Sequence, residues 1–207
     1  MKPILVYDTE TSGLPLFKEP SEHPDQPHVV QLAAQMVDHD SRRVISTLNL
    51  IIQPDGWLIP DDVAKVHGIT TEFAAAHGVP EGLAVEMLLE MNAQCSHRVA
   101  HNEQFDARIV RIACMRHMTD IVADEWKHAP AQCTARMSTP VIQLPPTDRM
   151  RSAGRFHYKT PNLGEAYRYF TGRELVGAHN AMVDAEACRD LYFALLDGSK
   201  GATEQAA

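Results

Sequence analysis

The chain has few of the features that mark membrane, secreted or nucleic-acid-coating proteins. Its 207 residues include four cysteines, far apart and without a CxxC pair, so neither a disulfide framework nor a zinc site is expected. No apolar run approaches the ~20 residues of a membrane helix, and the N-terminus lacks the apolar core of a signal peptide. The net charge of −8 argues against a basic nucleic-acid coat. We therefore predict a cytoplasmic protein with reduced thiols and no membrane partner.

What remains is an ordinary globular composition, 44% hydrophobic and 22% charged. This length predicts one domain, placed at residues 1–197, with a flexible tail over residues 198–207. Strand-like and helical patterns succeed one another, which predicts an α/β sheet with a hairpin on one side. Strands are expected at 3–7, 28–38, 43–52 and 97–100, helices at 60–68, 80–93, 103–118, 161–172 and 181–196, and irregular chain at 136–160.

The stretch ILVYDTETSGLP ends an apolar run with two carboxylates, Asp8 and Glu10. Side chains at i and i+2 of a strand point the same way, so the two project together if the strand continues through them. Two adjacent negative charges repel one another, and a divalent cation bound by both relieves that repulsion. A solvated strand end explains the pair equally well, so the pair alone does not decide the question.

Two later segments, HNEQFD and HNAMVD, share the pattern His-Asn-x-x-x-Asp. The asparagine of each is predicted to cap a helix, and the aspartate, Asp106 or Asp184, lies about one turn inside it. The histidine, His101 or His179, is left in the loop before the cap. Both segments fall where open α/β sheets bind ligands. The sequence therefore predicts four carboxylates and a histidine at one sheet edge, without deciding between the two histidines.

DTETSGLP, HNEQFD and HNAMVDAEA, in this order and at these separations, resemble the three motifs of the DEDDh 3′–5′ exonuclease superfamily. PDDVAKVHGITTE also resembles a segment between the first two motifs in members similar to polymerase III proofreading subunits and exonuclease X. The likeness spans roughly residues 3–196. It implies a ribonuclease H-like α/β fold, in which helices flank a five-stranded mixed sheet.

The resemblance also implies which residues do the chemistry. Two divalent cations, Mg²⁺ or Mn²⁺, would be bound by the matching carboxylates Asp8, Glu10, Asp106 and Asp184. His179, and not His101, matches the histidine that acts as general base. Two cations can neutralise charge on the attacking and leaving oxygens of a phosphodiester, and hard oxygen ligands favour Mg²⁺ or Mn²⁺ over zinc. An unperturbed imidazole titrates near ~6.5 and can accept a proton at neutral pH.

Several further positions match substrate-binding or supporting positions of the superfamily. Thr11 and Leu14 match residues that hold the terminal nucleotide, by a backbone contact and by wedging against its base. His67 lies in the VHGIT segment, and packing near a helix end is the simpler interpretation of it. The candidates together are Thr11, Gly13, Leu14, His67, Asn102 and Phe105.

Residues 136–160 form a basic strip in an otherwise acidic chain. They carry five cations, Arg136, Arg149, Arg151, Arg155 and Lys159, against the single acid Asp148. Phosphate contacts use such cations and make binding salt-dependent. We predict that Arg151, Arg155 and Lys159 contact the substrate backbone upstream of the cut, with a mobile, solvated loop as the alternative.

The predicted function is stepwise release of nucleoside 5′-monophosphates from a nucleic acid with a free 3′ end. Single-stranded DNA is favoured as the substrate, and an exoribonuclease that trims RNA 3′ ends is the first alternative. A non-catalytic nucleic-acid-binding module is the second; it predicts the loss of a metal ligand or of the base, and none is replaced here. A polymerase partner and a homodimer both remain open.

Overall fold

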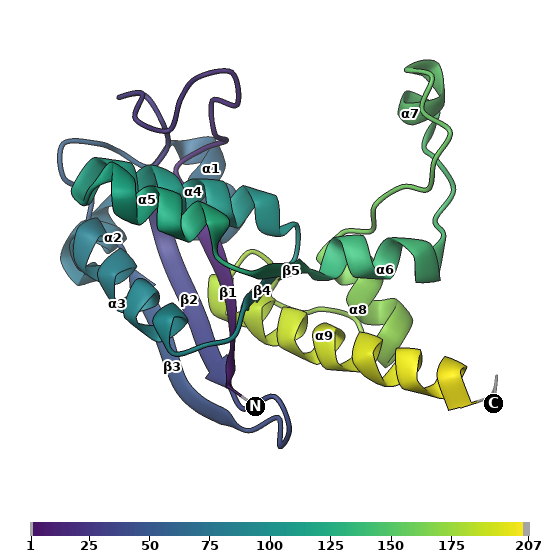
Figure 1. The fold of residues 1–207 in the computed structure, drawn as a ribbon. Coiled ribbons are helices and arrows are strands. Elements are labelled where there is room, and N and C mark those ends of the chain that lie inside the picture. The colour runs from purple at the N-terminus through teal and green to yellow at the C-terminus, as the bar shows by residue number, and fades with distance from the viewer. Residues whose placement is uncertain (1, 205–207) are drawn as a thin grey trace.

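The computed structural model describes residues 2–204, and its centre is a five-stranded mixed sheet in the order β3-β2-β1-β4-β5 (Figure 1). The central strand β1 is antiparallel to β2 and parallel to β4, while β5 is parallel to β4 and β3 antiparallel to β2. This confirms the predicted fold class. The strands are β1 (Ile4–Thr11), β2 (Val29–Val37), β3 (Val44–Ile51), β4 (Arg98–Ala100) and β5 (Ala131–Cys133).

Helices cover both faces of the sheet (Figure 1). The helices α3, α4 and α5 pack on one face, and α9 packs on the other with α6 and α8 beside it. None of the helices within residues 2–204 is long and apolar enough to cross a membrane. Their bounds are α1 (Asp61–His67), α2 (Thr71–His77), α3 (Glu81–Ala93), α4 (Glu103–His117), α5 (Asp120–His128), α6 (Thr134–Ile142), α7 (Asp148–Ser152), α8 (Leu163–Thr171) and α9 (Ala181–Glu204).

The central strand β1 is buried on both faces, as its unbroken apolar run predicts. Leu5 and Tyr7 belong to the large core cluster under α3, α4 and α5. Ile4 and Val6 belong to the cluster under α9. Because side chains alternate along a strand, Asp8 and Glu10 leave β1 on the α9 face.

The prediction of irregular chain over residues 136–160 is wrong in part. Helix α6 continues through Pro140 and ends at Gln143, whose left-handed φ of 55° closes it. A short helix, α7, follows, capped by the Thr147 side chain. Pro140 has no N–H to donate to the carbonyl of residue 136, and α6 ends two residues later, at Ile142.

The start of α8 and the end of α9 also differ from the predictions. Helix α8 begins at Leu163 and not at residue 161, because Asn162 caps it and forms a reciprocal capping box with Glu165. Helix α9 runs to Glu204, well beyond the expected end at residue 196. Residues 205–207 of the predicted tail lie outside the described residues, and the division at residue 197 stays a prediction.

Candidate active site

The first two carboxylates lie where β1 reaches the edge of the sheet. Asp8 and Glu10 are half-buried and sit opposite Ala33 and Gln31 of β2. The register shifts after Glu10, at a bulge. Bulges re-aim side chains at the end of a strand. The strand does continue through both acids, so the prediction that they project together is confirmed.

The N-terminus of α9 comes close to β1 because the residues between them are small. Ala33 of β2 packs against Ala181 and Ala185 of α9, all fully buried. The Gln31 side chain accepts a hydrogen bond from the Ala181 N–H at 3.0 Å. Alanines allow this close approach, and Gln31 fixes the helix end. Together they place Asp184, one turn inside α9, beside Glu10.

Asp184 is held by the backbone of His179, which lies just before the capping residue of α9. His179 has a left-handed φ of 66°, and its N–H donates to Asp184 Oδ2 at 2.9 Å. The Asn180 side chain accepts from the Met182 N–H at 3.1 Å, which confirms the predicted cap. Asp184 Oδ1 is buried and has no hydrogen-bond partner among the described residues. A buried, unpaired carboxylate oxygen fits an atom that binds a cation.

Asp106 reaches the same edge from α4, on the other face of the sheet. It is 3% exposed, and its Oδ1 accepts two hydrogen bonds from Thr9, from the N–H at 3.1 Å and from the hydroxyl at 2.7 Å. Thr9 therefore fixes the orientation of Asp106, whose charge acts on both Asp8 and Glu10. The sequence predictions overlooked Thr9, although its position between Asp8 and Glu10 is a usable signal, because alternation sends its side chain towards α4.

The expected cap at the start of α4 is not formed. Asn102 makes no side-chain capping bond and instead takes a left-handed φ of 65°. Asparagine is among the few residues that enter this conformation readily. Asn102 thus contributes its backbone conformation, and not its side chain, to the turn before α4. The capping prediction is therefore wrong for the first His-Asn segment and right for the second.

The four carboxylates cannot all carry charge at low energetic cost. Burial, followed by the charges of Asp106, Asp184 and Glu10, raises the pKa of Asp8 well above its usual range. Burial, then the charges of Asp184 and Asp106, raises the pKa of Glu10 to about 7. Burial raises the pKa of Asp106 to about 7 despite its bonds from Thr9, and burial also raises the pKa of Asp184. Bound cations would remove this strain.

The side chains fit a divalent metal site. Glu10, His179 and Asp184 each present a ligand atom, all within 4.8 Å of one another. The buried, unpaired Oδ1 of Asp184 and the mutual repulsion of the acids point the same way. All the donors except the imidazole are oxygen atoms, which suits a hard cation.

The two histidines of the repeated motif have different environments. His179 is exposed at the mouth of the cluster. His101 is only partly exposed; its Nδ1 lies 2.9 Å from Thr134 Oγ1 and its Nε2 lies 3.1 Å from the Pro161 carbonyl oxygen. Burial lowers the pKa of His101. His101 thus ties the end of β4 to the chain before α8, and the structure separates two histidines that local sequence could not.

The nucleotide-binding candidates lie just after Glu10. Thr11 is buried, and its hydroxyl donates to the Gly13 carbonyl at 2.7 Å. Leu14 is 75% exposed. His67 faces the Thr11 backbone and His179, and its pKa is lowered by burial and then by His179. The structure therefore brings Thr11, Gly13, Leu14 and His67 to the edge that holds the carboxylates.

The remaining candidates lie against the core or on a projecting segment. Phe105 is half-buried and packs against the core under α4. Arg151, Arg155 and Lys159 belong to an arm, residues 143–160, that projects from the body with α7 at its tip (Figure 1). Arg151 pairs with Asp148 at 3.2 Å, and Lys159 pairs with Glu165. The structure does not bring these three cations into contact with the carboxylates.

The loop between β1 and β2, residues 12–28, has a defined shape. Its two ends are joined by paired bonds, from the Ser12 N–H to the His28 carbonyl and from the His28 N–H to the Ser12 hydroxyl, both 2.9 Å. The buried Gln26 side chain bonds the main chain inside the loop. This loop carries Leu14, so these bonds hold the main chain from which that exposed side chain projects.

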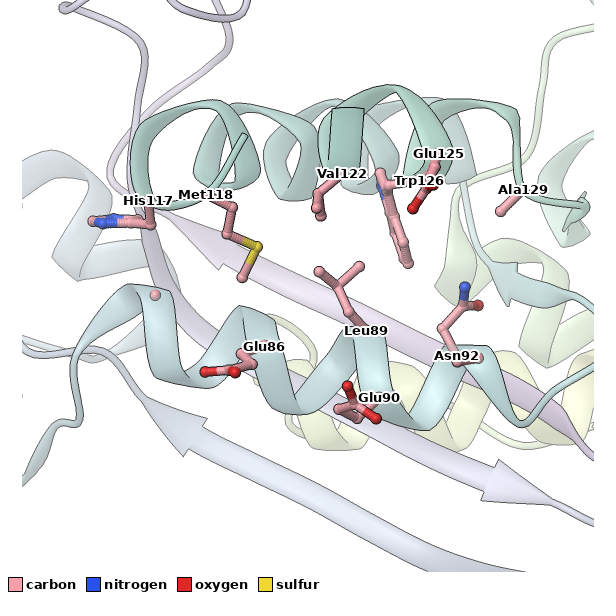
Figure 2. A pocket seen from close by; sticks show the side chains of 12 residues that line it. Glu86, Leu89, Glu90, Asn92, His117, Met118, Val122, Glu125, Trp126 and Ala129 are labelled. Atoms are coloured by element: carbon pink, nitrogen blue, oxygen red, sulfur yellow. The ribbon is translucent and has the colours of Figure 1, made fainter. Parts of the chain in front are cut away.

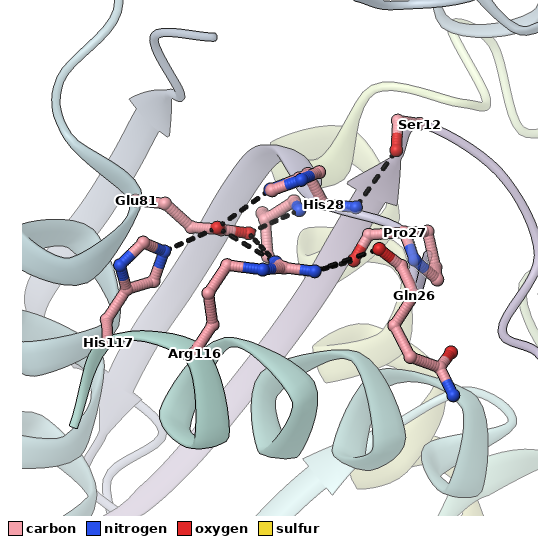
Figure 3. A network of polar contacts seen from close by, with 8 residues as sticks. Ser12, Gln26, Pro27, His28, Glu81, Arg116 and His117 are labelled. Carbon is pink, nitrogen blue, oxygen red and sulfur yellow. Dashed lines mark hydrogen bonds and ion pairs between the residues drawn. The ribbon is translucent and has the colours of Figure 1, made fainter. Parts of the chain in front are cut away.

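A buried glutamate anchors the far end of this loop to two helices (Figure 3). Glu81, at the start of α3, accepts hydrogen bonds from His117 at 2.7 Å, from the Val29 N–H at 2.8 Å, from His28 at 3.0 Å and from Arg116 at 3.1 Å. Burial alone would raise the pKa of Glu81, but these bonds outweigh it and hold that pKa far below its usual range. The carboxylate is therefore stable only as the anion.

We expect Glu81→Gln to lower the free energy of unfolding by about 1.5–3 kcal/mol at pH 7, because the partners of a buried anion lose charge-assisted bonds. A lowered carboxyl pKa stabilises the fold above the unfolded pKa of ~4.3 and loses this effect as the pH falls towards the folded pKa. The difference in the free energy of unfolding between the variant and the unchanged protein should therefore become smaller below about pH 4. Urea denaturation at pH 7 and pH 3.5 measures it, and the exposed Glu86→Gln on the same helix is the control. A difference that stays constant with pH contradicts this account of Glu81.

One cavity of the described residues does not coincide with the carboxylates. It has a volume of about 700 Å³ and lies between α3 and α5 (Figure 2). Leu89, Val122 and Trp126 are among its lining residues. Trp126 packs edge-on against Tyr7, with ring centroids 5.5 Å apart, and Tyr7 leaves β1 on the face opposite to Asp8. The cavity thus lies across the sheet from the acidic cluster.

A ribonuclease H-like sheet with four acids and a loop histidine at one edge defines the DEDDh class of 3′–5′ exonucleases. A family model described as "Exonuclease" (RNase_T) matches residues 5–192. The chain belongs to this exonuclease family. No curated protein sequence matches it.

Solved structures with a similar fold include several of exonuclease I. E. coli exonuclease I in complex with a dT13 oligonucleotide matches with a TM-score of 0.71 and 21% identity, over 95% of this chain and 41% of that chain. A complex of exonuclease I with a dA16 oligonucleotide, also from E. coli, matches with a TM-score of 0.68 and 19% identity, over 94% and 41% of the two chains. The chain thus spans about two fifths of the length of these proteins, and at this identity the likeness concerns the fold.

Proposed function

We propose that the protein is a metal-dependent 3′–5′ exonuclease that releases nucleoside 5′-monophosphates from the 3′ end of single-stranded DNA. The observation that carries the proposal is the convergence of Asp8, Glu10, Asp106 and Asp184 at one sheet edge, with His179 at its mouth. The family membership supports nuclease chemistry. The single-stranded DNA in the exonuclease I complexes favours DNA as the substrate.

The residues of the chain have separable tasks in this reaction. Divalent cations, Mg²⁺ or Mn²⁺, when held by the four acids, would neutralise phosphate charge and acidify the attacking water. His179 is exposed beside the cluster and can take the proton of that water. The backbone N–H of His179 also bonds Asp184. The same residue thus supplies the proposed base through its ring and orients a proposed metal ligand through its main chain.

The terminal nucleotide is expected to rest on the segment that follows Glu10. The hydroxyl of Thr11 is engaged with the Gly13 carbonyl, so this turn offers its main chain to a sugar or phosphate. Leu14, 75% exposed on a loop of defined shape, can pack against the terminal base. Such packing would hold the terminal nucleotide so that the scissile phosphate lies over the acids.

The test uses the full-length protein and matched 20-nucleotide DNA and RNA strands with a label at the 5′ end. In Mg²⁺ we expect a ladder of DNA products shortened from the 3′ end, nucleoside 5′-monophosphates as the released species, and slower loss of RNA. A strand blocked with a 3′-phosphate is the control and should resist. Internal cleavage products, or activity that survives EDTA, would contradict the proposal. Faster hydrolysis of the RNA strand would move the assignment to an exoribonuclease.

A further inference from the structure

The arm carries two exposed aromatic side chains among its cations. Phe156 is 75% exposed and Tyr158 is 46% exposed. Arg155 and Lys159 flank them in the segment Arg155-Phe156-His157-Tyr158-Lys159, so aromatic and cationic side chains belong to the same short stretch of the arm. An exposed phenyl ring close in sequence to cations, on a projecting arm, suits a ligand that has both an apolar face and negative charge.

The arm is a shaped element and not a random loop. The Lys159 N–H donates to the Leu144 carbonyl at 2.9 Å, which joins its two sides, and the Arg155 N–H donates to the Met150 carbonyl at 2.9 Å. The Tyr158 hydroxyl donates to the Gln143 side chain at 3.3 Å. These bonds hold the aromatic side of the arm in place without covering the Phe156 ring.

The base of the arm meets the sheet edge that holds the acids. Pro161, directly after the arm, accepts from His101 through its carbonyl at 3.1 Å. His101 follows β4, which is the parallel neighbour of β1. The C-terminal end of the arm is therefore joined to the segment that follows β4, and the arm extends away from the body (Figure 1).

We propose that Phe156 and Tyr158 form a stacking site for unpaired bases upstream of the scissile 3′ end. The proposal rests on the exonuclease function and deepens it, since it names a single-stranded chain of several nucleotides as the ligand. The rings stack on base faces, and Arg155 with Arg149 contacts the phosphates between them. Stacking tolerates any base, and a duplex, whose base faces are already covered, is excluded from this site.

Binding measured in EDTA separates stacking from charge, because no hydrolysis occurs. Fluorescence anisotropy would follow a labelled, mixed-sequence 20-nucleotide DNA strand at several salt concentrations. We expect Phe156→Ala to weaken binding roughly 5- to 100-fold, as the loss of one stacked base predicts, with an unchanged dependence on salt. Arg155→Ala should instead reduce the slope of log K against log salt by about 0.7. Phe156→Tyr should restore most of the affinity.

The matched control is Ile121→Ala, which removes a side chain of similar exposure (68%) from α5 and should leave binding unchanged. Wild-type affinity in Phe156→Ala would overturn the stacking site. So would a change in sedimentation showing that Phe156 joins two copies of the chain. The proposed function is judged separately, by Mg²⁺-dependent hydrolysis in the unchanged protein. If Phe156→Ala weakens DNA binding but the unchanged protein does not hydrolyse DNA, the exonuclease function is refuted. If the unchanged protein hydrolyses DNA but Phe156→Ala binds it normally, only the stacking site is refuted.

Discussion

Asp184→Asn is expected to lower kcat/KM on single-stranded DNA by at least about 10³-fold, which corresponds to about 4 kcal/mol of transition-state stabilisation. The substitution keeps the shape of the side chain and the acceptor for the His179 N–H. It removes the charge at Oδ1, the buried oxygen that has no partner among the described residues. A loss of this size therefore reports on cation binding and not on a collapsed helix end.

The same substitution should make the metal-free protein more stable. The charge of Asp184 helps to raise the pKa values of Asp8 and Glu10, so its removal relieves repulsion. About 1 kcal/mol would raise the Tm by about 2–4 °C in a domain of this size. A carboxyl group with a raised pKa favours the fold below its unfolded pKa and loses that effect as the pH rises through the folded pKa, here about 7. The gain should therefore be larger at pH 8 than at pH 5.5.

Thermal denaturation in EDTA at the two pH values, together with steady-state kinetics in Mg²⁺, measures both effects. Asp120→Asn, exposed at the start of α5, is the control for each. The assignment of Asp184 fails if the variant keeps more than a tenth of the wild-type kcat/KM. A lower Tm in EDTA would show that the charge of Asp184 stabilises the fold, against the electrostatics described above.

Sequence patterns were sufficient for the features that depend on local chemistry. The unbroken apolar run of β1 predicts a central strand, and the i, i+2 spacing places Asp8 and Glu10 on one face. Gly68 and Gly172 end α1 and α8 in the left-handed conformation, as glycine favours. Such features involve a few neighbouring residues, so the sequence contains most of the physical information.

Contacts between distant segments were not predictable in the same way. Thr9 orients Asp106 across 97 residues, and Gln31 holds the Ala181 N–H across 150. Thr9 and Gln31 are polar residues in strands, and a local sequence pattern does not reveal which distant group such a residue will bond. The difference between His101 and His179 depends on Pro161 and on Asp184, so it appears only when the chain is folded.

His179→Ala is expected to lower kcat by about 10²- to 10⁴-fold, the usual contribution of a positioned general base. The exposed imidazole lies beside the acids and not under them, so water reaches both it and the cluster. Because the His179 backbone, and not its ring, bonds Asp184, removal of the ring should leave the carboxylate in place. KM for DNA should change by less than about threefold, since the ring contributes to the transition state and not to ground-state binding.

A role for His179 as a metal ligand also has structural support, because a ring nitrogen of His179 lies within 4.8 Å of ligand atoms of Glu10 and Asp184. If the ring bound a cation, its removal would weaken metal affinity as well as slow the reaction. Calorimetric titration with Mn²⁺ separates the two roles. A base predicts unchanged affinity with a low kcat, while a ligand predicts a loss of about 10-fold or more in affinity and recovery of rate at high Mn²⁺. His128→Ala, exposed on α5, is the matched control. Wild-type kcat in His179→Ala would remove the residue from both roles and leave proton transfer to solvent.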